Sequence, residues 1–198
     1  AATVPVTLVA EKVIATMPDS TVVPMWGFRD VTDNTNPGVW RIPTISAVAG
    51  DILTITLNND LNLGPGLVEP VSIMIPGQKA TEGFAMKPAF FDDGQGRSRV
   101  RSFTHEAAPG GAGVYYEWDN LKAGTYLIQS ATHTAVQMQM GLYAILKVDA
   151  GAAEAYTGVA YDSEVTLLFS EIDPVLHSAV TADDYGPGKG MTSTMDYH

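Results

Sequence analysis

Cysteine is absent from the 198 residues of this chain. Its absence excludes disulfide bonds, thiolate zinc sites and a cysteine nucleophile. It also excludes the cysteine-containing blue-copper site that proteins use for electron transfer. Long apolar runs are missing as well, since no stretch reaches the roughly 18 residues that a membrane-spanning helix needs. The sequence therefore predicts a chain without a membrane span.

Basic residues are scarce, with 11 Lys and Arg against 22 Asp and Glu, which gives a formal net charge of -11. Because neutralising phosphates takes clustered lysine and arginine, this balance argues against a nucleic-acid partner. The one basic cluster is Arg97, Arg99 and Arg101. At alternate positions these three would share one face of a strand. We interpret them as a solvated strand face rather than an anion site.

Apolar residues make up 45% of the chain, which is enough for a substantial core. We expect a single domain over residues 1–181 and a flexible tail over residues 182–198. The start at Ala1 has neither an initiator Met nor a charged n-region, as is typical of a chain left by signal peptidase. A recombinant start would look the same. The prediction is an exported protein, periplasmic or extracellular.

Alternation of apolar and polar residues predicts an all-β chain of about eight or nine strands. The predicted strands include residues 4–17 and 21–30 as a hairpin, 52–59, 71–75, 114–118, 125–128, 140–148 and 164–169. Residues 83–101 are interpreted as an irregular insertion. Asp173 and Pro174 provide an N-cap and a first helical residue, so one short helix is expected near the C-terminus. The fold class is a Greek-key β-sandwich, cupredoxin-like or immunoglobulin-like, because periodicity alone does not separate the two.

Residues 124–148 read Gly-Thr-Tyr, a polar loop with one histidine, and then Gly-Leu-Tyr before a final strand. This frame resembles the cupredoxin domains of multicopper oxidases, which carry Gly-Thr-Tyr-Trp-Tyr-His-Ser-His and then Gly-Leu-Tyr-Gly. Pro43, Ile45, the Gly-Asp turn at residues 50–51 and the strand leading to Leu61 add to the resemblance. It covers residues 40–172 and implies the amino-terminal cupredoxin domain of a laccase-like protein. The tail resembles the linker to a second domain.

The resemblance fails at the copper ligands. Family members carry two histidines in each of two motifs, and those four histidines serve a copper cluster. The matching positions here are Met74 and Pro76 in the first motif, and Gln129 and Ala131 in the second. None of these side chains replaces an imidazole, so the resemblance implies a domain that is not catalytic by itself.

A different metal site is the second hypothesis. His105, His133, Met138 and Met140 could form a mixed nitrogen and sulfur site for Cu(I), since thioethers and imidazoles are the ligands that copper accepts. Gln-Met-Gln-Met would place both methionines on one face of a strand. That face could equally be buried, and we favour this interpretation because methionine is first of all a packing residue. Copper is therefore the candidate cofactor, and the sequence establishes no cofactor by itself.

Three functions remain open at this point. The favoured one is a scaffold or assembly module that keeps the sandwich without the copper chemistry. The others are the copper-binding part of an active oxidase and a His/Met Cu(I)-binding protein. The expected partners are further cupredoxin domains or subunits, including other copies of the chain. Apolar residues at 84, 86, 90 and 91 predict that the 83–91 segment packs against such a partner.

Overall fold

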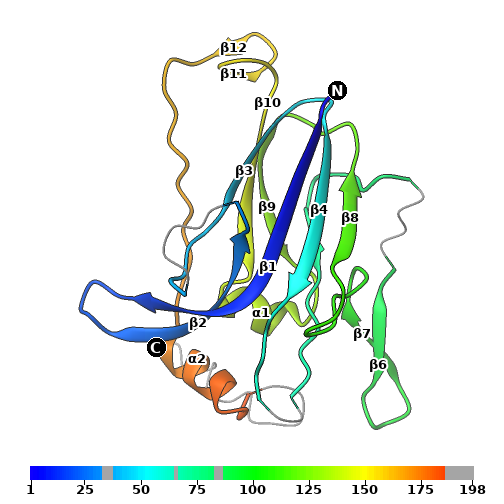
Figure 1. Cartoon of the computed structure of the whole chain (residues 1–198), viewed down its shortest axis with the longest axis vertical. Helices are drawn as coiled ribbons and strands as arrows, with labels where there is room; N and C mark the ends of the chain where they lie inside the picture. The colour runs from blue at the N-terminus through cyan, green and yellow to red at the C-terminus, as the bar shows by residue number, and fades with distance from the viewer. Residues whose placement is uncertain (33–37, 65–66, 83–86, 186–198) are drawn as a thin grey trace.

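A computed structural model of the chain describes residues 1–32, 38–64, 67–82 and 87–185 (Figure 1). Two four-stranded sheets pack face to face and form the body of the domain. The first sheet has the order β2 (Val22–Asp30), β1 (Thr3–Thr16), β4 (Ile52–Asn59) and β8 (Val114–Trp118). The second has the order β3 (Thr44–Val48), β10 (Tyr143–Asp149), β9 (Gly124–Ser130) and β5 (Ile73–Met74). The predicted all-β sandwich is confirmed.

Each sheet mixes parallel and antiparallel neighbours. β1 pairs with β2 as the predicted antiparallel hairpin, but it pairs with β4 in parallel. In the second sheet β10 is parallel to β3 and antiparallel to β9. Strands that are far apart in the sequence therefore become neighbours, as in Greek-key sandwiches.

The main apolar core lies between the sheets. The alternation in β4 turns Leu53, Ile55 and Leu57 inward, and each is completely buried. Opposite them lie buried residues of the second sheet, such as Ile128 and Leu146, in the same cluster. Burial of each such side chain stabilises the fold by roughly 1.5–3 kcal/mol. The clean alternation is why these strands could be predicted.

Residues 83–101, predicted to be irregular, contain an antiparallel hairpin of β6 (Ala89–Asp92) and β7 (Ser98–Ser102). Asp93 organises its turn, because its carboxylate accepts from the backbone N–H of Gln95 at 3.0 Å and from Arg97 and Arg99 at 2.8 Å each. The interpretation of a solvated face holds for these two exposed arginines. Phe84 and Met86 lie outside the described residues. A second small ribbon, β11 (Glu154–Tyr156) with β12 (Val159–Ala160), lies at the opposite end of the molecule (Figure 1).

The stretch predicted to alternate as a strand through Met138 and Met140 is a helix, α1 (Thr134–Met140). Gly141 ends it with a left-handed backbone, φ 109°, and its N–H bonds the carbonyls of Gln137 and Met138. A Cβ at Gly141 would lie 2.6 Å from the carbonyl oxygen of Trp26. The prediction was wrong because four alternating residues imitate a strand period, whereas glycine at the C-cap is the stronger signal.

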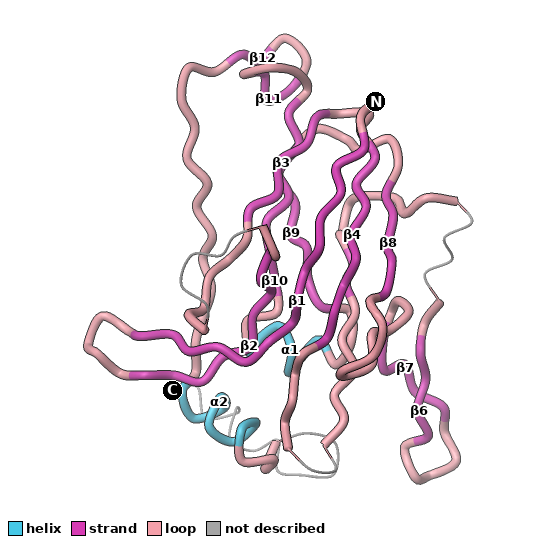
Figure 2. The backbone as a smooth tube through the Cα atoms, viewed as in Figure 1, coloured by secondary structure: helices cyan, strands magenta, loops and turns pink. Residues whose placement is uncertain are grey.

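The strand predicted over residues 164–169 was also wrong. These residues belong to a long extended connection between β12 and α2, drawn as loop in Figure 2, and they take no part in a ladder. Val165 is 79% exposed, Leu167 70% and Phe169 89%. Residues 164–169 therefore have the apolar composition of a buried strand, but they pair with no sheet.

The predicted C-terminal helix is confirmed as α2 (Pro174–Thr181). Asp173 caps it, accepting from the backbone N–H groups of Val175 at 2.9 Å and Leu176 at 3.3 Å. The domain therefore has two short helices where one was predicted. Within the described residues, neither helix is long and apolar enough to cross a bilayer.

Candidate functional site

The two segments that resemble the paired-histidine motifs lie side by side in the second sheet. β5 and β9 are antiparallel neighbours, and Met74 lies directly opposite Gln129. Both side chains are half-buried, while Pro76 is exposed and Ala131 is buried. The sheet edge thus brings the two motifs together, but with a thioether and an amide at the facing positions.

A buried cluster of hydroxyl groups lies next to these strands. Ser72 Oγ bonds both Ser102 Oγ and Thr132 Oγ1 at 2.8 Å. Ser130 Oγ donates to the carbonyl of Thr132 at 3.0 Å, and Thr104 Oγ1 donates to the carbonyl of Ile73 at 3.1 Å. Because a buried hydroxyl without a partner is costly, this set fixes β5, β7 and β9 to one another.

Arg101 and Glu106 form a bidentate ion pair beside the hydroxyl cluster. Nη2 lies 2.5 Å from Oε2, and Nε donates to Oε1 at 3.1 Å. The hydrogen bond to Glu106 raises the pKa of Arg101. Thr132 Oγ1 also donates to Glu106 at 3.1 Å. The prediction of a solvated face was therefore wrong for Arg101, because its guanidinium is half-buried and paired with Glu106.

His133 lies at the start of α1 with a left-handed backbone, φ 39°. Its Nδ1 is 2.9 Å from Glu69 Oε1. Gln137 Nε2 donates to the same carboxylate oxygen at 2.6 Å and to the carbonyl of Pro70 at 2.8 Å. Glu69 is thereby held in place by two donors from α1 and its N-terminal turn. A carboxylate only accepts, so Nδ1 carries a proton, and in the neutral imidazole Nε2 presents the lone pair.

His105 has different surroundings. Its Nε2 donates to the carbonyl of Tyr115 at 2.9 Å, and its ring stacks on Tyr116 with centroids 4.3 Å apart. Nδ1 is buried and has no hydrogen-bond partner among the described residues. Burial raises the pKa of Tyr116, whose hydroxyl donates to the carbonyl of His105. His105 is thus packed against Tyr115 and Tyr116 of β8.

The two methionines of the predicted metal site do not share a face. Positions two apart in a helix point about 200° away from each other. Met140 is completely buried in the main core, while Met138 is half-buried. The burial expected for Met140 is confirmed, and its thioether is a packing group. Among the described residues no group of three or more His, Asp or Glu side chains is arranged to hold a metal ion. The mixed His and Met site stays a prediction.

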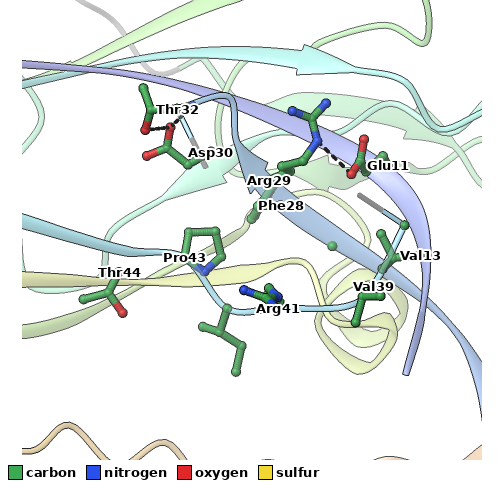
Figure 3. Close-up of a pocket in the computed structure, with 13 residues that line it drawn as sticks. Glu11, Val13, Phe28, Arg29, Asp30, Thr32, Val39, Arg41, Pro43 and Thr44 are labelled. Carbon is green, nitrogen blue, oxygen red and sulfur yellow. Dashed lines mark hydrogen bonds and ion pairs between the residues drawn. The ribbon is translucent and has the colours of Figure 1, made fainter. Parts of the chain in front are cut away.

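A polar cavity of about 530 Å³ lies between the β1–β2 hairpin and the segment that leads into β3 (Figure 3). Arg29 Nε donates to Glu11 at 2.9 Å within it, and Asp30 accepts from Thr32. Arg41 lines the same cavity (Figure 3). Because Arg29 is already neutralised by Glu11, this cavity offers a weaker attraction to an anion than its arginines suggest.

Glu69, Gln137 and Glu106 were not singled out from the sequence. Glu69 lies 64 positions from His133, and no local pattern indicates the contact. The isolated Glu-Pro pair at residues 69–70 carries no signal that could have identified it. Only the packing of the loop before β5 against α1 brings these groups together.

No family model and no curated protein match this sequence. Solved structures do match. The chain is 20% identical to a multi-copper oxidase from Pseudomonas thermotolerans, with a TM-score of 0.55 over 76% of this chain and 31% of that one. A laccase-like multi-copper oxidase, CueO, from Ochrobactrum sp. gives 15% identity and a TM-score of 0.51 over 74% and 27%. A copper nitrite reductase from Nitrosomonas europaea gives 16% and 0.50 over 74% and 41%.

The chain spans less than half the length of each of these structures. Identities of 15–20% leave function to the residues, while the TM-scores of 0.50–0.55 establish the fold. They also decide between the two sandwich types considered from the sequence: the chain is a cupredoxin-like domain.

Proposed function

We propose that this chain is the first cupredoxin domain of an exported multicopper-oxidase-like protein and serves there as a scaffold or assembly module without copper chemistry of its own. Residues 1–181 would form the domain, and residues 182–198 would lead toward the next one. The partners would be further cupredoxin domains or subunits.

The observation that carries the proposal is the pairing of Met74 with Gln129 on β5 and β9. In a cluster-forming domain these two motifs would supply imidazoles at facing positions. Here one motif offers a thioether and Pro76, which has no ligand atom, and the other offers an amide and Ala131. Cu(II) in oxidases needs several nitrogen ligands, and these four residues supply none of the imidazole type.

Exposed apolar segments support the assembly part of the proposal. Val165, Leu167 and Phe169 are exposed along the connection between β12 and α2, and Phe90 and Phe103 are more than half exposed at the β6–β7 hairpin. Monomeric proteins seldom leave clusters of this kind uncovered. A neighbouring domain or subunit would bury them.

Oxygen consumption tests the absence of catalysis. The purified chain is loaded with copper, dialysed and mixed with a phenolic substrate or Fe(II) in an oxygen electrode cell. We expect the rate of a free-copper control and no more. A rate above that control would contradict the proposal.

Sedimentation velocity tests assembly. A double variant, Phe90→Ser/Phe91→Ser, probes the β6–β7 hairpin, and Phe169→Ser probes the extended connection. Tyr156→Ser, at an exposed position of β11, is the matched control. We expect the wild-type chain and the control to associate as concentration rises, and at least one of the two test variants to associate less. A wild-type chain that stays monomeric, with a melting temperature that neither variant changes, would count against assembly.

Copper binding is the alternative function, and one observation favours it. The Nδ1 of His133 is anchored by Glu69, which is the arrangement that orients metal-binding histidines elsewhere. In this case the chain would bind about one Cu(I) and lose it on His133→Ala. A competition titration with a Cu(I) chelator measures this directly.

A further inference from the structure

A cavity of about 520 Å³ is lined by residues of α1, the C-terminal end of α2, β7 and the loop after β4. Both helices lie in the lower part of the domain in Figure 1. The walls of the cavity are mainly apolar. They include Trp26, Phe103 and Tyr185, together with Leu63, Val136 and Val180. Small-molecule sites in proteins have volumes of roughly 300–1,000 Å³ and this kind of lining. Three aromatic side chains suit a ligand with a flat apolar body.

His133 supplies the directional group of the cavity. It is one of the lining residues, and its Nδ1 is occupied by Glu69. Within the described part of the chain Nε2 has no hydrogen-bond partner. Because the carboxylate holds the proton on Nδ1, Nε2 is the hydrogen-bond acceptor of the neutral imidazole. Gln137 holds the same carboxylate, so the acceptor is fixed in orientation before any ligand arrives.

The charges around the cavity select the ligand further. Glu69 places a carboxylate in its wall. Arg101 also lines it, but its guanidinium is committed to Glu106 at 2.5 Å and 3.1 Å. The surroundings are therefore net negative, in a chain that already carries -11. An anionic ligand would be repelled, while a neutral or cationic one would not.

The backbone of His133 adds an independent observation. A left-handed conformation, φ 39°, is unusual for a residue with a side chain. It costs on the order of 1–3 kcal/mol and persists only where the surrounding structure imposes it. Such strain concentrates at ligand sites. The imidazole of this residue contacts Glu69 and lines the cavity.

From these features we propose that the cavity binds a small aromatic molecule, neutral or cationic, whose hydroxyl or amino group donates a hydrogen bond to His133 Nε2. The aromatic body would lie against Trp26, Phe103 and Tyr185. Of the four paired-histidine motif positions, Ala131 lines this cavity, but its methyl group offers no ligand atom. The proposed site therefore goes beyond the scaffold role, and it can be tested without copper.

Four probes of nearly equal shape separate the contributions. 2-Phenylethanol and phenethylamine carry a donor, ethylbenzene lacks it, and phenylacetate replaces it with a negative charge. Chemical shifts of the ¹⁵N-labelled full chain are followed in a titration with each probe. For ligands of about nine heavy atoms we expect dissociation constants on the order of 1 mM for the two donors. Ethylbenzene should bind roughly fivefold more weakly because one hydrogen bond is lost, and phenylacetate at least about tenfold more weakly.

Two variants locate the binding. Ala135 lines the cavity and is exposed, so Ala135→Trp should fill the opening without disturbing the core and should abolish binding of every probe. Ala152→Trp, at an exposed alanine near β11, is the matched control and should leave binding unchanged. His133→Phe keeps a ring but removes the acceptor, and should reduce the affinity for the two donors to that for ethylbenzene.

The proposal is overturned by any of three results. These are equal affinity for phenylacetate and 2-phenylethanol, binding that survives Ala135→Trp, and shift changes centred away from α1, α2 and β7. No saturable shift with any probe at concentrations about tenfold above the expected constant would overturn it as well. Because Ala135 is exposed, these outcomes remain decisive even if His133→Phe fails to fold.

Discussion

Glu69 Oε1 lies 2.9 Å from Nδ1 of His133, although the two residues are 64 positions apart in the chain. The same oxygen accepts from Gln137 Nε2 at 2.6 Å. One carboxylate thus joins the loop before β5 to the first turn of α1. It also fixes the tautomer of the one histidine that lines the apolar cavity.

Replacing Glu69 with Ala should lower the free energy of unfolding by about 2–3 kcal/mol, because the donors on His133 and Gln137 lose their shared acceptor. Urea denaturation measures the loss. Glu82 is 94% exposed, and its contact with Lys79 at 3.9 Å is weak, so Glu82→Ala is the control and should change stability little. Equal stability of both variants would show that the Glu69 contacts are not structural.

Met140→Ala should cost about 2–5 kcal/mol of stability with or without Cu(I), since the side chain is completely buried in the main core. Met138→Ala, at a half-buried position of the same helix, should cost less. Denaturant melts of both variants in the presence and absence of Cu(I) compare the two. If the Met140→Ala loss appeared only in copper-loaded samples, Met140 would be a ligand and not a packing residue.

Gly141→Ala should destabilise the domain by at least about 3 kcal/mol. The backbone there has φ 109°, and a Cβ would lie 2.6 Å from both the Trp26 carbonyl oxygen and Trp40 Nε1. Gly96 has a similar positive φ of 73° with open space around it, so Gly96→Ala isolates the backbone cost of about 1–2 kcal/mol. Thermal unfolding of both variants separates the clash from the backbone strain, and similar losses would exclude the clash.

Asp93 should titrate at an acidic midpoint. Its hydrogen bond with Arg99, aided by the N–H of Gln95 and by Arg97, lowers the pKa from the ordinary 3.8 to about 2. A depressed carboxyl pKa stabilises the fold above the unfolded value, and this contribution disappears as pH falls from about 4 through about 2. A ¹³C NMR titration of the carboxyl group measures the midpoint. Arg99→Gln should raise it more than Arg97→Gln does, and an unchanged midpoint would refute the pairing.

The sequence by itself determined the parts of the fold that depend on local alternation and local caps. β1, β2, β4, β8 and the Asp173 cap of α2 were predicted because each rests on residues a few positions apart. The family resemblance added the cupredoxin type of sandwich. Where a short pattern was ambiguous the prediction failed, as at Gln-Met-Gln-Met, which forms α1.

Tertiary structure alone decided the site. Met74 faces Gln129, Glu69 meets His133, and Arg101 pairs with Glu106 only because distant strands and loops pack together. It also decided that residues 164–169 form no ladder here, since a strand needs a neighbour and the sequence specifies only its apolar composition. Local interactions are readable along a chain because they act over a few residues. Contacts across a β-sandwich join residues whose separation carries no periodic signal.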